Sequence, residues 1–105
     1  IAREEIFGPV LSVIAYDDVD DAVRIANDSD YGLAGSVWTD DDDRGLAVAA
    51  AIHTGTFGVN QGYTMDPFAP FGGVKASGYG RELGREGIDG YTDTKSIAVA
   101  PRRSA

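Results

Sequence analysis

Apolar residues near the start of the chain follow two different spacings. Residues 10–16, VLSVIAY, are apolar almost throughout and rich in β-branched side chains, which predicts a strand covered on both faces. The next apolar positions have the i, i+3, i+4, i+7 spacing of one helix face, and Asp17 or Asp18 can cap that helix. The positions are Val19, Ala22, Val23 and Ala26. Residues 27–32 are predicted to end the helix.

A second helix is predicted between two further strands. Residues 35–39, GSVWT, and 56–60, TFGVN, read as strands, and the intervening residues 39–55 read as a helix. Thr39 and the Asp three positions later have capping-box spacing, and Gly55 is placed to end the helix in a left-handed turn. The order strand, helix, strand, helix, strand predicts an α/β fold with a parallel βαβαβ unit.

The pattern changes from residue 62 onward. Glycine and proline become frequent, which predicts an irregular loop, and residues 82–90 predict one or two helical turns. Residues 94–100, TKSIAVA, alternate weakly and predict a short terminal strand that needs a partner.

Composition excludes several classes of function. The 105 residues carry 17 acidic and 9 basic side chains, for a net charge of −8, which argues against a nucleic-acid surface. The longest apolar run is too short to cross a membrane. The chain has no Cys, hence no disulfide and no Cys nucleophile, and a reducing cytoplasm fits best. The acidic runs 17–21 and 40–43 lie at predicted helix starts, so we interpret them as caps and predict no metal site.

The stretch EEIFGPV, residues 4–10, carries the clearest chemistry. In an extended segment Glu5 and Phe7 face the same way. A carboxylate suits two adjacent ribose hydroxyls, and a flat ring packs against a heterocycle such as nicotinamide. The alternative interpretation of these residues is a capped entry to a core strand.

Several stretches in register resemble the C-terminal part of the aldehyde dehydrogenase superfamily, and a chain end similar to the family's terminal strand follows them. The stretches are EEIFGPV at 4–10, YGLAGSVWT at 31–39, GTFGVN at 55–60, PFGGVKASGYGRE at 70–82 and GYTDTKSIAV at 90–99.

This resemblance implies a mechanism that the chain holds only in part. In the family an upstream Cys attacks the aldehyde, a hydride passes to NAD or NADP, and an upstream Glu activates the water that releases the acid. We therefore expect a C-terminal fragment without catalytic residues of its own and inactive in isolation. Residues 1–93 would belong to the catalytic domain, and residues 94–105 would form a terminal oligomerisation strand and tail.

The resemblance also assigns roles to single residues. Glu5 matches the Glu that holds the nicotinamide ribose, and Phe7 matches the aromatic residue beside the nicotinamide ring. Asn60 is expected to be a structural polar residue near the active site. Met65 and Phe71 are candidates for the substrate channel, in a loop too unlike other members to identify the aldehyde.

The terminal strand implies a homodimer or homotetramer, because the family adds this strand to a sheet of the neighbouring subunit. A different class of function also stays open, namely a stand-alone α/β module that binds a protein or a nucleotide without catalysis. The missing nucleophile favours that alternative. The apolar surface that so few helices would leave exposed argues against it.

Overall fold

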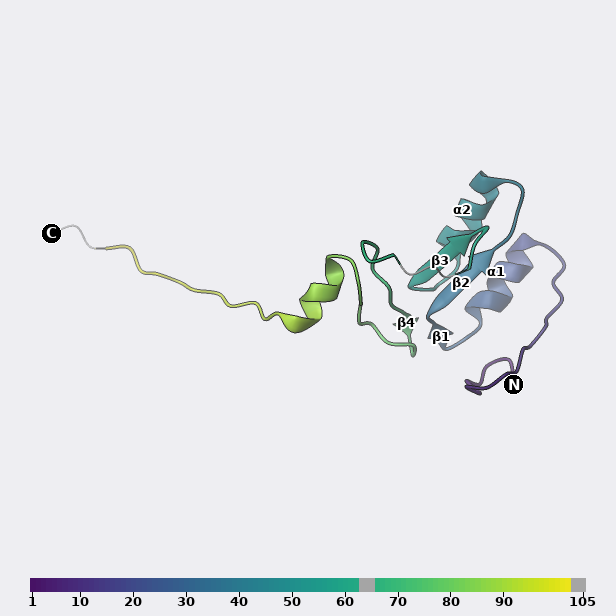
Figure 1. The fold of residues 1–105 in the computed structure, drawn as a ribbon, viewed down its shortest axis with the longest axis horizontal. Coiled ribbons are helices and arrows are strands. Elements are labelled where there is room, and N and C mark those ends of the chain that lie inside the picture. The colour runs from purple at the N-terminus through teal and green to yellow at the C-terminus, as the bar shows by residue number, and fades with distance from the viewer. Residues whose placement is uncertain (63–65, 103–105) are drawn as a thin grey trace.

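The computed structural model describes residues 1–62 and 66–102. Figure 1 shows two helices beside short strands, followed by a long C-terminal tail that leaves the body of the molecule. The elements in chain order are α1 (Val19–Asn27), β1 (Tyr31–Gly32), β2 (Ala34–Val37), α2 (Asp42–Ala51), β3 (Thr56–Val59), β4 (Val74–Lys75) and the 3₁₀ helix η1 (Glu86–Tyr91). The α/β class predicted from the sequence is confirmed.

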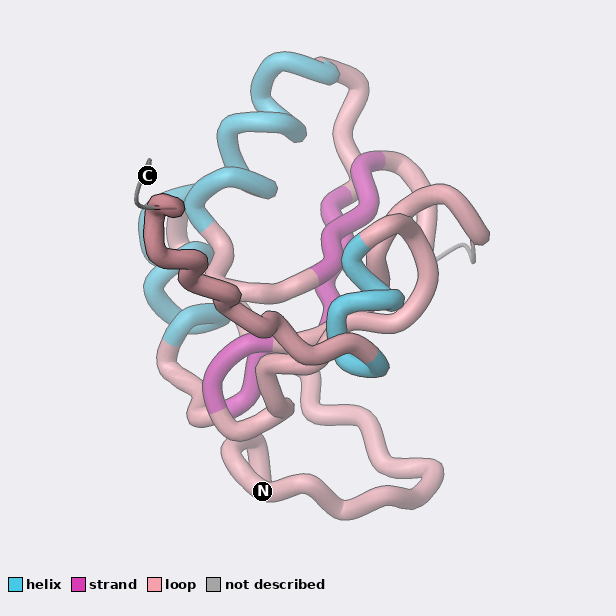
Figure 2. The backbone as a smooth tube through the Cα atoms, turned by 90° about the vertical axis from the view of Figure 1, so that its left-hand side faces the viewer, coloured by secondary structure: helices cyan, strands magenta, loops and turns pink. Residues whose placement is uncertain are grey.

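The central unit is a parallel strand pair joined by a helix. β2 pairs with β3 in the register Ala34↔Thr56 to Val37↔Val59, and α2 packs against both strands. Figure 2 shows both α-helices on the same side of this pair. This half of the predicted βαβαβ unit is therefore present.

A second, antiparallel pair was not predicted. β1 pairs with β4 over two residues, in the register Tyr31↔Lys75 and Gly32↔Val74. Two residues are too few to show an alternation of apolar and polar side chains, so these strands could not be predicted from the sequence pattern. The pair places the glycine-rich region after residue 70 against the end of α1.

The helix boundaries follow local capping. Asp18 caps α1 by accepting a hydrogen bond from the Asp21 main-chain N–H at 2.8 Å. The Arg24 side chain and the Asp17 main-chain N–H both donate to the Asp21 carboxylate and lower its pKa. The sequence allowed either Asp17 or Asp18 as the N-cap, and the structure shows that Asp18 is the cap.

The prediction for the second helix was wrong at both ends. Asp41 is the N-cap of α2, because its carboxylate accepts from the Arg44 N–H at 3.1 Å, whereas the Thr39 hydroxyl accepts from Asp41 N–H before the helix starts. The helix ends at Ala51 since Ile52 is already extended. Gly55 donates its N–H to the Gly32 carbonyl at 3.1 Å and so leads into β3 instead of ending the helix.

Two predicted strands have no pairing partner in the described part of the chain. Neither residues 10–16 nor residues 94–100 belong to a sheet, and the side chains of Leu11 and Val13 are 86% and 88% exposed. A strand forms only where a neighbour supplies main-chain partners, and no described strand lies beside these segments. The predicted turns at 82–90 are present as η1, displaced by a few residues.

Apolar side chains remain largely uncovered. No hydrophobic side chain among the described residues is fully buried, although α1 and α2 both turn apolar residues toward the strands. The described residues thus do not enclose a core of their own.

Candidate functional site

The N-terminal segment presents Glu5 and Phe7 to solvent. The Phe7 side chain is 95% exposed, and its φ of 54° lies in the left-handed region, so the segment does not keep the simple alternation assumed from the sequence. An ion pair between Arg3 and Asp28 ties this segment to the end of α1. Among the described residues, the Glu5 carboxylate has no hydrogen-bond or ion-pair partner.

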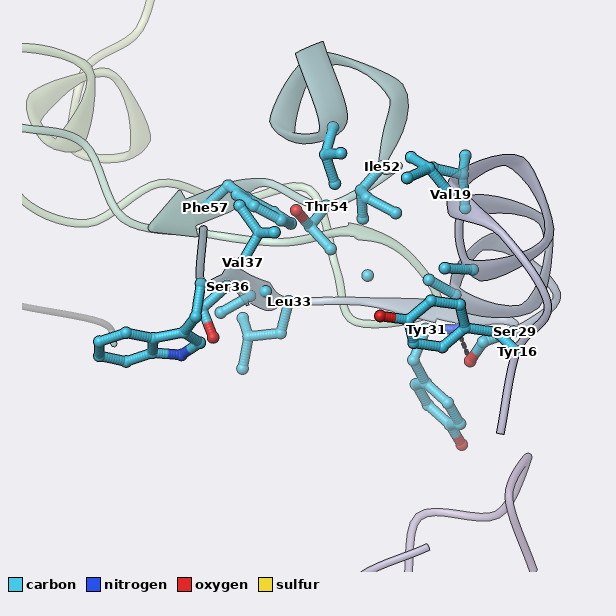
Figure 3. Close-up of a pocket in the computed structure, with 18 of the residues that line it drawn as sticks. Tyr16, Val19, Ser29, Tyr31, Leu33, Ser36, Val37, Ile52, Thr54 and Phe57 are labelled. Carbon is cyan, nitrogen blue, oxygen red and sulfur yellow. Dashed lines mark hydrogen bonds between the residues drawn. The ribbon is translucent and has the colours of Figure 1, made fainter. Parts of the chain in front are cut away.

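A large cavity opens beside the β2–β3 pair. Its volume is about 970 Å³, and its lining includes Glu5, the apolar face of α1 and a continuous run of residues 31–40. Figure 3 shows Tyr16 and Tyr31 near one end of the cavity and Phe57 near the other. The remaining sequence candidates, Phe7, Asn60 and Phe71, do not line it.

Asn60 joins the carboxyl ends of the two parallel strands. Its side-chain oxygen accepts the Thr39 main-chain N–H at 2.8 Å, and its amide donates to the Asp42 carboxylate at 3.3 Å. Its φ of 55° turns the chain sharply at the end of β3, a conformation that Asn tolerates better than most residues. Asn60 therefore fixes β2, β3 and the first turn of α2 relative to one another.

Exchanging the charges of this pair tests that interpretation. Asn60→Asp loses the amide donor and sets two carboxylates about as close as the present bond, so we expect a loss of about 1 kcal/mol in unfolding free energy. The double variant Asn60→Asp, Asp42→Asn restores a donor and an acceptor and should recover most of the loss. Thermal unfolding of the single and double variants measures both. Additive losses in the double variant would contradict a direct contact.

The stretch 70–82 is a tightly wound loop. Phe71 and Glu82 exchange two main-chain hydrogen bonds of 2.8 Å, and Arg81 donates to the carbonyls of Gly73 at 2.7 Å and Gly80 at 2.9 Å. A Cβ on Gly55 would lie 1.9 Å from the Gly72 carbonyl, so the loop rests directly on the start of β3. This packing sets the position of Phe71. Met65 lies outside the described residues.

The role of Lys75 was not predicted from the sequence. Its ammonium donates to the carbonyls of Asn27 and Ser29 at 3.0 and 2.9 Å, which satisfies the carboxyl end of α1. Its acceptors are main-chain groups far away in sequence, and no side-chain pattern predicts such contacts. Lys75 connects the glycine-rich loop to α1.

The aldehyde dehydrogenase family model matches residues 1–97. The chain belongs to the aldehyde dehydrogenase family. The family predicted from the sequence is thereby confirmed, and the wound loop at 70–82 lies within the matched part.

Relatives within the aldehyde dehydrogenase family are much longer than this chain. A geranial dehydrogenase of Castellaniella defragrans is 60% identical over 97 residues, which are 92% of this chain and 20% of that protein. A putative aldehyde dehydrogenase of Staphylococcus saprophyticus is 53% identical over 98 residues, 93% of this chain and 20% of that protein. The chain thus spans about a fifth of the length of the curated relatives it matches.

Solved aldehyde dehydrogenases share the conformation of the chain. The crystal structure of a Mycobacterium tuberculosis aldehyde dehydrogenase complexed with NAD+ matches with a TM-score of 0.86 and 53% identity. That match covers 99% of this chain and 21% of the other. A Staphylococcus aureus betaine aldehyde dehydrogenase in complex with NAD+ matches with a TM-score of 0.81 and 44% identity, over 85% of this chain and 18% of the other.

A metal ion or a membrane would each require a recognisable feature in the part of the chain that the structure describes. There, no three His, Cys, Asp or Glu side chains gather in a way that would hold a metal ion. None of the described helices has the length and apolar character needed to span a membrane.

Proposed function

We propose that this chain is the C-terminal part of an NAD- or NADP-dependent aldehyde dehydrogenase that oxidises aldehydes to carboxylic acids. The observation that carries the proposal is the shared conformation, over 99% of the chain, with a relative solved in complex with NAD+. Residues 1–93 are proposed to belong to the catalytic domain and residues 94–105 to the terminal oligomerisation strand and tail. The nucleophilic Cys, the general-base Glu and the Rossmann domain are assigned to the rest of the polypeptide.

The role proposed for the chain's own residues is to hold and orient the cofactor. A bound NAD or NADP would supply the hydride acceptor, and Glu5 and Phe7 would hold its nicotinamide ribose and ring. The Glu5 carboxylate has no partner among the described residues and is available to accept two ribose hydroxyls. The ring of Phe7 is 95% exposed and available to pack against nicotinamide. Both side chains therefore fit the cofactor contacts assigned to them.

Substitution of Glu5 in the full-length enzyme tests the proposed function. Two charge-assisted hydrogen bonds contribute about 1.5 to 3 kcal/mol each, so Glu5→Ala should lower kcat/KM for the cofactor about tenfold or more. The hydride step should slow as well, because the ring is no longer held in place. Steady-state kinetics, with a deuterium isotope effect measured on the C1-deuterated aldehyde, reports both changes.

Glu4→Ala is the matched control, because it removes the adjacent exposed carboxylate. It should leave kcat, the cofactor KM and the isotope effect close to those of the unsubstituted enzyme. If Glu5→Ala behaves like Glu4→Ala, the carboxylate of Glu5 is only a solvated surface group and the cofactor assignment is wrong.

Met65 and Phe71 are proposed to line the substrate channel. Met65→Trp should penalise bulky aldehydes relative to acetaldehyde, by the roughly 1 to 3 kcal/mol with which apolar pockets discriminate size. The near-isosteric Met65→Leu should not. Because one relative is named a geranial dehydrogenase, geranial belongs in the series of aldehydes compared. Equal kcat/KM ratios across aldehyde sizes in both variants would remove Met65 from the channel.

A cytoplasmic location accompanies this proposal. It is supported by the absence of Cys from the chain and by a rat relative named as cytosolic, 44% identical over 94% of this chain and 20% of that protein.

A further inference from the structure

The N-terminal segment, residues 1–9, makes few polar contacts. Its main-chain hydrogen bonds are local and join residues two or three positions apart. Between described residues, the bond from the Arg3 guanidinium to the Asp28 carboxylate is the one hydrogen bond or ion pair that joins this segment to the later part of the chain. This pair is therefore the polar anchor of the segment that carries Glu5 and Phe7.

The Asp28 side of the pair is held firmly. Asp28 is the C-cap residue of α1, and its own N–H donates back into the last turn of that helix. The Lys75 ammonium donates to the carbonyls of the two flanking residues, Asn27 and Ser29, at 3.0 and 2.9 Å. The Asn27 side-chain amide also donates to the Ala51 carbonyl, at the end of α2, at 2.9 Å. Asp28 is thus a fixed point to which the N-terminal segment can be attached.

Helix capping does not account for a carboxylate at this position. The carbonyl groups at the end of a helix carry partial negative charge, so an acidic side chain there is unfavourable and a basic one is favourable. Asp28 directly follows the last residue of α1. The Arg3 guanidinium neutralises the carboxylate and also places a positive charge near the helix end. Pairing with Arg3 therefore explains an acidic residue that the helix itself does not need.

Arg3 is close in sequence to both proposed cofactor residues. Two residues of extended chain span at most about 7 Å, so fixing Arg3 restricts where the main chain of Glu5 can lie. The Glu5 side chain lines the large cavity beside α1. A segment that is already held in place loses less conformational freedom when a ligand binds, and the ligand binds more tightly for that reason.

We propose that Arg3 and Asp28 form a positioning pair, which holds Glu5 and Phe7 in place for the cofactor. The inference rests on the proposed function, which assigns Glu5 and Phe7 to the nicotinamide nucleotide. The side chains of Arg3 and Asp28 are 64% and 57% exposed, and ion pairs this exposed change an equilibrium constant about two- to fivefold. A surface ion pair without influence on the cofactor is the competing interpretation.

Arg3→Gln in the full-length enzyme distinguishes the two. We expect the Kd for NAD+ or NADP+, measured by titration calorimetry without aldehyde, to rise about two- to fivefold. The kcat/KM for the cofactor should fall by the same factor, whereas kcat/KM for the aldehyde at saturating cofactor changes little. In the cofactor-free enzyme, the amides of residues 3–7 should exchange their hydrogens faster, because the segment has lost its anchor.

Arg24→Gln is the matched control. It removes the same charge from α1, where Arg24 is 68% exposed and pairs with Asp21 instead of the N-terminal segment. Cofactor affinity and the exchange of residues 3–7 should stay as in the unsubstituted enzyme. If Arg3→Gln has no more effect than Arg24→Gln, the proposal is overturned.

A charge exchange tests for direct contact. Arg3→Asp alone places two carboxylates side by side and should weaken cofactor binding at least as much as Arg3→Gln. The double variant Arg3→Asp, Asp28→Arg restores opposite charges and should recover most of the affinity and the slow exchange. A purely structural role for either residue gives no such recovery. A double variant that binds the cofactor no better than Arg3→Asp overturns the pair.

The outcome is separable from the proposed function. If Glu5→Ala weakens cofactor binding and Arg3→Gln does not, the positioning pair alone is overturned. Faster exchange in Arg3→Gln with unchanged cofactor affinity also overturns it, because the segment is then held without effect on the cofactor. A full-length protein in which Arg3→Gln speeds exchange and weakens NAD+ binding, but which oxidises no aldehyde, supports the pair and overturns the proposed function alone.

Discussion

Purified residues 1–105 are expected to produce no NADH or NADPH from any aldehyde. The chain contains no Cys, so it has no thiolate to attack the carbonyl carbon. It also leaves its apolar side chains largely exposed, which argues that the cofactor surface around Glu5 is not held in a binding geometry by these residues alone. Nucleotide absorbance measures turnover, and titration calorimetry with NAD+ and NADP+ measures affinity.

The full-length enzyme at equal molar concentration is the matched control. It should turn over the same aldehydes under the same conditions. A lack of turnover by residues 1–105 then cannot be attributed to an unsuitable substrate. Turnover above the blank by residues 1–105 would contradict the assignment of the nucleophile to the rest of the polypeptide. Micromolar cofactor binding without turnover would instead favour a stand-alone nucleotide-binding module.

The sequence predicted correctly those elements that depend on residues close together in the chain. The apolar spacing from Val19 to Ala26 predicted α1, and the capping acids before it narrowed its start to two residues, of which the structure uses Asp18. The parallel pairing of β2 with β3 followed from the order of the elements around α2. These features depend on neighbours within a few residues or on chain direction, and a sequence displays both.

The second helix shows where local rules compete. Thr39 and Asp41 are both acceptable caps, and the sequence alone favoured Thr39 because of its capping-box spacing. In the structure Asn60 accepts the Thr39 N–H, which holds Thr39 at the end of β2 and leaves Asp41 to cap α2. A contact from Asn60, 21 positions after Thr39, thus determines where α2 begins. The spacing of apolar residues does not predict such a contact.

Contacts with main-chain groups distant in sequence could not be predicted, for the same reason. Lys75 and Arg81 both donate to carbonyl groups, and every residue has a carbonyl, so the partner cannot be identified from residue type. The site shows a similar division. Residue chemistry suggested a carboxylate and a ring for a nicotinamide nucleotide, whereas the left-handed φ of Phe7 did not follow from any local preference.

The segments predicted as strands but found unpaired mark a different limit. Residues 10–16 have the composition of a buried parallel strand, yet pairing requires a neighbour that the described part of the chain does not contain. A continuous hydrophobic pattern predicts that a segment is buried on both faces. It does not say whether the covering element lies in the same stretch of chain.

Removal of residues 94–105 from the full-length enzyme is expected to lower its assembly state and its melting temperature together. The tail is extended through residue 102, runs away from the body of the molecule in Figure 1, and exposes 78% of Ile97 and 86% of Val99. An extended segment without a strand partner offers main-chain donors and acceptors to another chain. Its apolar side chains would be covered only on association, so the loss should depend on protein concentration.

Two substitutions refine the truncation without shortening the chain. The double variant Ile97→Asp, Val99→Asp places charge on the apolar positions of the strand, whereas Ser96→Asp adds a charge at a neighbouring polar position and is the matched control. Light scattering should report a smaller particle for the truncation and the double variant, and an unchanged homodimer or homotetramer for the control. A truncated enzyme with unchanged mass and melting temperature would mean that the tail pairs within its own subunit. The proposed route of assembly through this strand would then be wrong.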